Sequence, residues 1–241
     1  MGIYQRKLAV MAEMAPELDL TVVVPPSWRD ERGVTRLERV DVDGYHLDVQ
    51  PLLFNGAFHT HFYPRLQQVI RRVKPDIVHI DEEPYNLATY HANVIARRTG
   101  AKTLWFSWQN LARRYPPPFS WIERYNLSHT DHALVGSRTA AQVWRAKGYR
   151  GDLDVIPQFG VDPGVFYAVD HPRLDDVVHI VYVGRLVPEK GCDLLVDALA
   201  RVRGPWRATF LGSGPESAAL QAQAMSSGLR DRVTFRPWLP S

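Results

Sequence analysis

The residues best suited to chemistry lie in segment 183–191, which reads V-G-R-L-V-P-E-K-G. A buried strand is expected to end at Gly184, so that Arg185 and Lys190 fall in the loop before a helix. Two cations and a helix N-terminus at the carboxyl end of a parallel strand stabilise an anion such as a diphosphate. The alternative is a surface loop with two solvated cations.

A second glycine-containing segment, 210–216, also leads from an expected strand to an expected helix. Gly212 and Gly214 would let backbone N–H groups approach a ligand closely. As a dinucleotide-binding fingerprint the segment is weak, because Ser217 occupies the third glycine position and no acidic residue clearly ends the next strand. The pattern therefore disfavours a nicotinamide-dependent oxidoreductase.

Acidic residues follow the expected strand 76–80 in the first half of the chain. Asp81, Glu82 and Glu83 could bind the hydroxyl groups of an acceptor, or one of them could have a raised pKa through like-charge crowding. The carboxyl ends of parallel strands line the ligand crevice of such sheets, which favours a functional interpretation. The alternative is a solvated acidic loop.

The next expected strand, 102–108, is followed by Gln109 and Asn110, and then by Tyr115 and the stiff run 116–119. These residues could shape an acceptor pocket. The alternative is a rigid connector, because consecutive prolines restrict the backbone in any case.

Metal and disulfide chemistry find little support in the composition. The single cysteine, Cys192, excludes a disulfide framework and a cysteine-based zinc site, and it fits a reducing compartment. His59 and His61 share an H-x-H spacing, but no further ligands are evident, so we expect neither a metal nor a cofactor.

The overall composition is that of a globular protein with a sizeable core. The 241 residues are 45% hydrophobic and 23% charged, and the net charge of +3 brings no nucleic-acid-binding signature with it. Arg71, Arg72 and Lys74 form one of several basic groups, which suit either an anionic membrane surface or ordinary solvation. No apolar run is as long as a membrane span, and the first residues do not form a signal peptide.

Hydrophobic periodicity predicts an α/β fold with doubly wound parallel sheets, because strands and helices alternate. Before residue 160 we expect a first helix within 4–15, strand 20–24, a hairpin turning at Asp43-Gly44, helix 64–74, strand 76–80, helix 84–98, strands 102–108 and 131–135, helix 137–147 and strand 154–156. After it we expect a buried strand 177–183, helix 193–202, strand 206–211, helix 215–227 and strand 232–235.

This order predicts two domains, 1–162 and 177–241, joined by a linker at 163–176. The first begins with a helix where a doubly wound domain begins with a strand and a tight loop. The second contains about half of the usual elements. We therefore expect that the first strand and the end of the second domain are missing from this chain.

Several segments resemble family 4 glycosyltransferases. Segment 184–191 is similar to the family motif G-R-L-x-x-x-K-G, 211–216 to its G-x-G-P-E turn, and 231–239 to its strand D-R-V-x-F-x-G-W-L-P. Upstream, 155–162 resembles the interdomain segment V-I-P-N-G-V-D, and 76–80 resembles D-I-V-H. The resemblance runs through most of the chain.

The resemblance implies a GT-B fold of two Rossmann-like domains and sugar transfer with retention of configuration. The N-terminal domain would bind the acceptor, and the C-terminal domain would bind a nucleotide-diphosphate sugar as co-substrate. Arg185 and Lys190 match the pair that grips the donor diphosphate and stabilises the departing nucleotide, so that no metal is needed. Gly184, Gly212 and Gly214 belong to the same donor site.

The departures from the family limit the expected activity. The strand at 102–108 usually ends near a histidine that faces the cleft, and here the matching residue is Gln109, which can hydrogen-bond an acceptor but cannot act as a base. Gln158-Phe159 stands where the family has a single Asn, and the paired-glutamate motif expected beyond Ser241 is absent. We therefore expect this chain alone to be inactive and to bind nucleotide sugars poorly.

The predicted function is that of a cytoplasmic glycosyltransferase, peripheral at the inner face of the cell membrane in one interpretation. Its acceptor would be a sugar, including a lipid-linked or cell-envelope glycan, and the acceptor contacts would come from Glu82, Glu83, Gln109, Asn110 and Tyr115. The alternative is a non-catalytic remnant that binds an anion or a partner.

Overall fold

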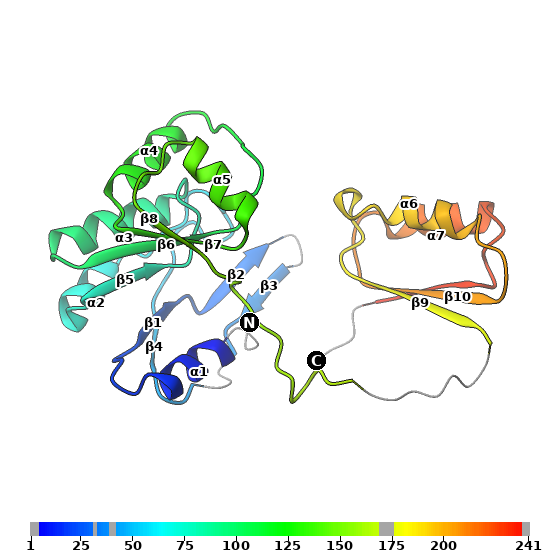
Figure 1. Ribbon diagram of the computed structural model, residues 1–241, viewed down its shortest axis with the longest axis horizontal. Helices are drawn as coiled ribbons and strands as arrows, with labels where there is room; N and C mark the ends of the chain where they lie inside the picture. The colour runs from blue at the N-terminus through cyan, green and yellow to red at the C-terminus, as the bar shows by residue number, and fades with distance from the viewer. Residues whose placement is uncertain (1–4, 31–32, 39–41, 169–175, 238–241) are drawn as a thin grey trace. The chain divides into compact units, whose positions relative to one another are not determined.

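The computed structural model describes residues 5–30, 33–38, 42–168 and 176–237, and these form two compact units (Figure 1). Unit 1 comprises Met1–Phe166 and unit 2 comprises Tyr167–Ser241. Part of the expected linker and the last residues of the strand motif at 231–239, including Trp238, lie outside the described residues.

The centre of unit 1 is a parallel sheet in which every strand follows its neighbour in sequence order. Its strands are β5 (Ile77–Ile80), β6 (Lys102–Ser107), β7 (His132–Val135) and β8 (Asp152–Val155), and its connecting helices are α3 (Leu87–Arg98), α4 (Phe119–His129) and α5 (Arg138–Ala146). Trp105, Trp144 and Tyr149 are fully buried between sheet and helices. The predicted parallel α/β architecture is confirmed here.

Local signals account for the ends of these helices. Ser137 accepts a hydrogen bond from the backbone N–H of Ala140, as a helix N-cap does, and Gly148 follows α5 with a φ of 101°. The sequence analysis did not anticipate α4, which begins directly after Pro118. The prolines before it indicate a connector, and Ser128 and His129 are only moderate helix formers. Packing against α3 overrides that weak propensity.

The N-terminal part of unit 1 contains α1 (Arg6–Met14), β1 (Thr21–Val24), β2 (Ser27–Asp30), β3 (Gly33–Arg36), β4 (His46–Val49) and α2 (Leu66–Val73). The hairpin predicted at Asp43-Gly44 is wrong. Gly44 does turn, with a φ of 78°, but the strand that follows pairs parallel to β1, and the antiparallel hairpin is formed earlier by β2 and β3. A glycine turn reverses the chain locally, whereas strand direction depends on which distant strand is available.

Unit 2 is a three-stranded parallel sheet with its two helices on one face (Figure 1). Its elements are β9 (Val178–Val183), the short 3-10 helix η2 (Pro188–Lys190), α6 (Cys192–Leu199), β10 (Trp206–Leu211), α7 (Ser217–Ser226) and β11 (Val233–Arg236). Strand β10 lies in the middle, and Phe210 is opposite Tyr182 in the register. The core combines Trp206 and Phe210 with Val196 and Leu220 of the helices.

The prediction that strand 177–183 is buried is wrong for one of its faces. Ile180 and Tyr182 pack against the core, but Val181 and Val183 are 62% and 58% exposed. Side chains alternate between the faces of a strand, and α6 and α7 cover only one face. The continuous apolar run therefore leaves valines on the surface of unit 2.

Candidate active site

The predicted donor loop lies between β9 and α6. Gly184 follows the strand, Arg185 is held through its carbonyl, which accepts a hydrogen bond from the Tyr182 hydroxyl at 2.9 Å, and Lys190 ends η2. Both cationic side chains are exposed, and no hydrogen bond or ion pair of the Lys190 ammonium to another described residue is present. Gly191 then adopts the left-handed conformation, with a φ of 61°, and starts α6. The loop thus presents cations at the carboxyl end of a parallel strand.

Gly212 and Gly214 lie against the backbone of the predicted donor loop. A Cβ atom on Gly212 would lie 1.8 Å from the carbonyl oxygen of Gly184, and one on Gly214 would lie 2.1 Å from that of Leu186. The space beside these glycines is therefore filled by the donor loop itself, and Leu186 N–H donates to the Ser213 carbonyl at 3.0 Å. The absence of side chains at Gly212 and Gly214 lets the two loops approach each other closely. Direct contact of either glycine with a donor stays a prediction.

A small hollow lies beside the two loops of unit 2, near the beginnings of α6 and α7. Its volume is about 70 Å³, and its lining includes Pro188, Cys192, Asp193 and Glu216. A drug-sized ligand requires roughly 300 Å³ or more, so this hollow does not hold a nucleotide. Burial raises the pKa of the neighbouring Tyr182 hydroxyl to about 12, with contributions from Cys192.

At the carboxyl edge of the unit 1 sheet, Glu83 is the centre of a hydrogen-bond network. Its carboxylate accepts hydrogen bonds from the Ser107 hydroxyl at 2.6 Å and from the Trp108 N–H at 2.9 Å. The Ser107 oxygen in turn accepts from the Trp144 indole at 2.8 Å and from the Gln109 N–H at 3.0 Å. Burial raises the pKa of Glu83, and these hydrogen bonds offset only part of that effect. Glu83 therefore joins the ends of β5 and β6.

Glu82 is likewise bonded within the protein. Its carboxylate accepts from the Asn86 amide at 2.9 Å and contacts His61 Nε2 at 3.2 Å. Burial lowers the pKa of His61, but the hydrogen bond and the charge of Glu82 outweigh burial, so that the net shift is upward. Both predicted acidic ligands thus support the frame of the site, and neither side chain is simply a solvated acidic group.

The three remaining predicted acceptor residues differ in their surroundings. Gln109 is 9% exposed, donates through Nε2 to the Leu111 carbonyl at 2.8 Å, and has a buried Oε1 atom without a hydrogen-bond partner among the described residues. Asn110 is exposed. Tyr115 stacks on Tyr85 with 4.1 Å between ring centroids. Gln109 therefore has one buried acceptor atom without a partner among the described residues at this edge, and Tyr115 offers part of an aromatic surface.

The sequence analysis missed the role of Gln158. Its side chain accepts a hydrogen bond from the Trp108 indole at 2.5 Å and donates one to Asp81 at 2.5 Å, so it joins the ends of β5 and β6 from outside the sheet. Asp81 also forms an ion pair with Lys7 at 3.4 Å. The signal was present in the sequence, because Gln158 is one of the two residues that replace a single Asn in the interdomain motif.

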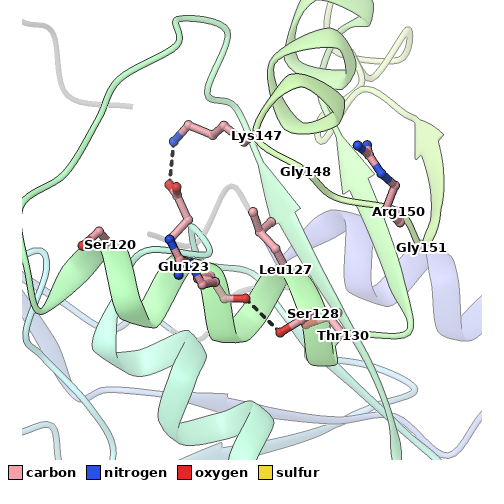
Figure 2. A pocket seen from close by; sticks show the side chains of 10 residues that line it. Ser120, Glu123, Leu127, Ser128, Thr130, Lys147, Gly148, Arg150 and Gly151 are labelled. Atoms are coloured by element: carbon pink, nitrogen blue, oxygen red, sulfur yellow. Dashed lines mark hydrogen bonds and ion pairs between the residues drawn. The ribbon is translucent and has the colours of Figure 1, made fainter.

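A larger hollow of about 670 Å³ lies elsewhere on unit 1, beside α4 and the loop from α5 to β8 (Figure 2). Lys147 and Glu123 form a hydrogen-bonded ion pair beside it at 2.5 Å, and Thr130 and Gly151 belong to loops that lead into β7 and β8. Those loops lie at the amino ends of the strands. The hollow contains none of the predicted site residues, and ligands of such sheets bind at the other edge.

Family models match both units of the chain. The model for a glycosyl transferase 4-like domain matches residues 2–158, and the model for glycosyl transferases group 1 matches residues 178–241. The chain therefore belongs to the glycosyl transferase 4-like family. The predicted resemblance to glycosyltransferases of this kind is confirmed.

Two curated relatives are similar over different lengths. A phosphatidylinositol N-acetylglucosaminyltransferase protein of Arabidopsis thaliana, one component of that enzyme, is 26% identical over 248 aligned residues, which cover 99% of this chain and 55% of the relative. The lipopolysaccharide core biosynthesis glycosyltransferase LpsE of Rhizobium meliloti is 34% identical over 127 residues, which cover 52% of this chain and 35% of the relative. The chain thus spans about half or less of the relatives it matches.

Solved structures show the same fold. HepE of Anabaena, in complex with UDP, is 15% identical with a TM-score of 0.62, and the match covers 81% of this chain and 56% of that one. The apo form of the lipopolysaccharide outer core galactosyltransferase WaaB is 24% identical with a TM-score of 0.53, and the match covers 73% of this chain and 47% of that one. These likenesses and the parallel sheets confirm the GT-B type of fold.

Proposed function

We propose that this chain supplies the acceptor-binding unit and the donor loop of a glycosyltransferase that uses a nucleotide-diphosphate sugar. The observation that carries the proposal is the β9–α6 loop, where Arg185 and Lys190 are exposed at the carboxyl end of a parallel strand. Matches of family models to both units support it. Similar structures hold UDP or UDP-glucose, which favours a uridine nucleotide for the donor.

Arg185 and Lys190 would act on the leaving group. When the bond between the sugar and the diphosphate breaks, negative charge accumulates on the departing nucleotide. A positioned cation therefore stabilises the transition state more than it stabilises the ground state. We propose that the two side chains provide this stabilisation without a metal, and that the sugar is transferred with retention of configuration. A cytoplasmic location is part of the same proposal.

The proposed acceptor is a sugar or a lipid-linked glycan. The names of the two curated relatives support it, because one name refers to phosphatidylinositol and the other to lipopolysaccharide core biosynthesis. We propose that Gln109 and Tyr115 contact the acceptor, and that Glu82 and Glu83 hold the frame around it. Asn110 is exposed and stays a candidate contact.

Membrane contact, if it accompanies this function, would be electrostatic. The apolar side of α2 is not available for insertion, because Leu66, Val69 and Ile70 are buried in unit 1. Arg65 and Arg71 are exposed, whereas Arg72 is paired with Asp48. No helix among the described residues is long and apolar enough to cross a bilayer. Co-sedimentation with liposomes should therefore require anionic lipid and should weaken with salt.

The donor assignment is tested by following the backbone amides of residues 184–191 by NMR while UDP is added to the 241-residue chain. We expect shifts in this loop with a dissociation constant of roughly millimolar order, because a few exposed charges contribute little affinity. Lys190→Ala should weaken the response, and Arg203→Ala, an exposed cation of the same unit, should not. An unchanged loop at about 10 mM UDP contradicts the donor site.

The same titration separates the proposal from its alternative. An anion-binding remnant would respond equally to inorganic diphosphate and to UDP, whereas a donor site should prefer the nucleotide. The expectation that the isolated chain neither binds nucleotide sugars tightly nor transfers them stays a prediction. Micromolar binding, or measurable sugar transfer by this chain, would show it to be wrong.

A further inference from the structure

His59 lies in an aromatic setting at the carboxyl edge of the unit 1 sheet. Its ring centroid is 5.5 Å from that of Tyr85, 5.9 Å from that of Tyr115 and 5.3 Å from that of Phe119. Its carbonyl accepts a hydrogen bond from the N–H of Leu87 at 3.0 Å, which fixes this segment to the first residue of α3. The side chain is half-buried.

A chain of hydrogen bonds leads away from one nitrogen of this ring. His59 Nδ1 lies 3.0 Å from Asn86 Oδ1, and Asn86 Nδ2 donates to Glu82 at 2.9 Å. His61 Nε2 completes the chain at 3.2 Å from the other oxygen of Glu82. Asn86 is 0% exposed and His61 is 3% exposed, so water does not compete for these bonds.

This series of hydrogen bonds determines which nitrogen of the neutral His59 ring carries the hydrogen. The amide nitrogen of Asn86 already donates to Glu82, so the group that faces His59 is the Asn86 carbonyl oxygen, which can only accept. His59 Nδ1 must therefore carry the hydrogen, and in the neutral ring the lone pair is on Nε2. That atom forms no hydrogen bond with any other described residue.

A lone pair beside aromatic rings suits a sugar. Sugar hydroxyl groups donate hydrogen bonds, and the C–H faces of the ring pack against aromatic side chains. Gln109 cannot act as a base, but its Oε1 atom, which is buried and has no hydrogen-bond partner among the described residues, is a second acceptor on a neighbouring loop of the same edge. Asn86 and Glu82 follow β5, and Gln109 follows β6, so all of these groups come from the carboxyl ends of parallel strands.

We propose that His59 is an acceptor-binding residue, whose Nε2 atom accepts a hydrogen bond from a hydroxyl group of the acceptor sugar. Tyr115 and Phe119 provide the apolar side of this subsite. Glu82 and Asn86 are positioning residues that orient the His59 ring and do not touch the sugar. The inference rests on the proposed function, since it assigns a residue that would bind the acceptor of that reaction.

The first test measures the tautomer in the free protein. Long-range ¹⁵N–¹H NMR correlations of histidine-labelled protein, recorded in mildly alkaline solution, should show His59 with hydrogen on Nδ1 and none on Nε2. The opposite tautomer would overturn the proposal, because Nε2 would then be a donor. Asn86→Leu should abolish the preference for one tautomer.

The second test measures the response of Nε2 to sugars. Methyl glycosides of glucose, galactose and N-acetylglucosamine, and myo-inositol, are added to the 241-residue chain. At least one should shift the His59 Nε2 resonance and leave that of His132, whose Nε2 pairs with Asp154, unchanged. No response to any of them overturns the proposal, as does a response in the Trp108 and Gln109 amides without one at His59.

Variants then separate contact from positioning. His59→Gln should weaken the affinity for the responding sugar about tenfold, the loss expected for one hydrogen bond, and His132→Gln should leave it unchanged. Glu82→Gln should weaken it less, because the chain of hydrogen bonds keeps an acceptor oxygen at that position. A larger loss with Glu82→Gln than with His59→Gln would make Glu82 the direct ligand and overturn the assignment.

The outcome is distinguishable from that of the proposed function. A sugar response at His59 without a UDP response in the β9–α6 loop would retain the subsite and contradict the glycosyltransferase proposal. A UDP response without a sugar response at His59 would support the donor site and contradict the assignment of His59 as an acceptor-binding residue.

Discussion

The carboxyl edges of the two sheets are built in different ways. In unit 1 the polar side chains are bonded to one another, as in the network of Glu83, Ser107 and Trp144. In unit 2 the loops are joined by backbone atoms at Gly212 and Gly214, and the cations Arg185 and Lys190 are exposed. Side chains in unit 1 therefore contribute to both the fold and the site, whereas in unit 2 different residues serve these two roles.

This difference teaches which substitutions are informative. When a buried polar group loses its partner, the free energy of unfolding decreases, because water does not replace the lost hydrogen bond. The exposed Lys190 ammonium is solvated, so its removal affects what binds there and leaves the free energy of unfolding almost unchanged. A change in activity is thus easier to interpret in the loop of unit 2 than at the edge of unit 1.

The largest expected effect is on turnover. In the enzyme that contains this chain, Arg185→Ala or Lys190→Ala should lower kcat/KM by about two to three orders of magnitude, since each removes a charge contact to the leaving group. For Lys190→Ala, the free energy of unfolding should change by less than about 0.5 kcal/mol, because this ammonium is exposed. Steady-state kinetics with chemical denaturation measure both quantities. Unchanged turnover removes the diphosphate assignment, and a large loss of stability contradicts the separation of roles.

The next effect is on the backbone of unit 2. Gly212→Ala should destabilise this unit by about 3 kcal/mol, because the new methyl group would overlap the carbonyl oxygen of Gly184. Gly204→Ala is the matched control, with a φ of 94° and nothing within 4 Å of its Cβ position, and should cost about 1 kcal/mol. Hydrogen exchange of the β10 amides reports on this unit. Equal costs would show that the loops do not depend on this close approach.

A smaller effect is expected in unit 1. Ser107→Ala should cost about 2 kcal/mol, because the buried Trp144 indole, the Gln109 N–H and Glu83 all lose a hydrogen bond. Ser128→Ala, where an exposed hydroxyl bonds only nearby atoms, should be close to neutral. Hydrogen exchange of the β6 amides measures the difference. If both variants are neutral, the network does not hold the edge together.

The smallest effect is a dependence on pH. The pKa of Glu83 is raised in the folded protein, so the folded state binds more protons than the unfolded state between the unfolded and the folded pKa. The stability that Glu83 contributes is fully present below the unfolded pKa, which is about 4.3 for glutamate, and is lost as pH rises through the folded pKa. Relative to Glu83→Gln, wild-type stability should decrease over this window. An increase would mean that the hydrogen bonds from Ser107 and Trp108 outweigh burial.

The sequence by itself determined the alternation of strands and helices, the Ser137 cap and the cationic loop of unit 2. Each of these depends on residues close together in the chain, such as Arg185 and Lys190 between a strand and a helix, so local patterns predict them. The predictions that depended on what covers a strand or where it pairs were less secure. The hairpin at Asp43-Gly44 and the burial of Val181 were wrong for that reason.

Only the tertiary structure decided which polar groups are bonded to one another. Glu83 and Ser107 are 24 residues apart, Ser107 and Trp144 are 37 apart, and His59 and Asn86 are 27 apart. A carboxylate or an imidazole can form hydrogen bonds with many kinds of partner, and the sequence does not show which partner it meets. Packing of the sheet and its helices excludes water and brings one partner within hydrogen-bond distance. For this reason Glu82 is interpreted as a positioning residue, and His59 as a residue that binds the acceptor.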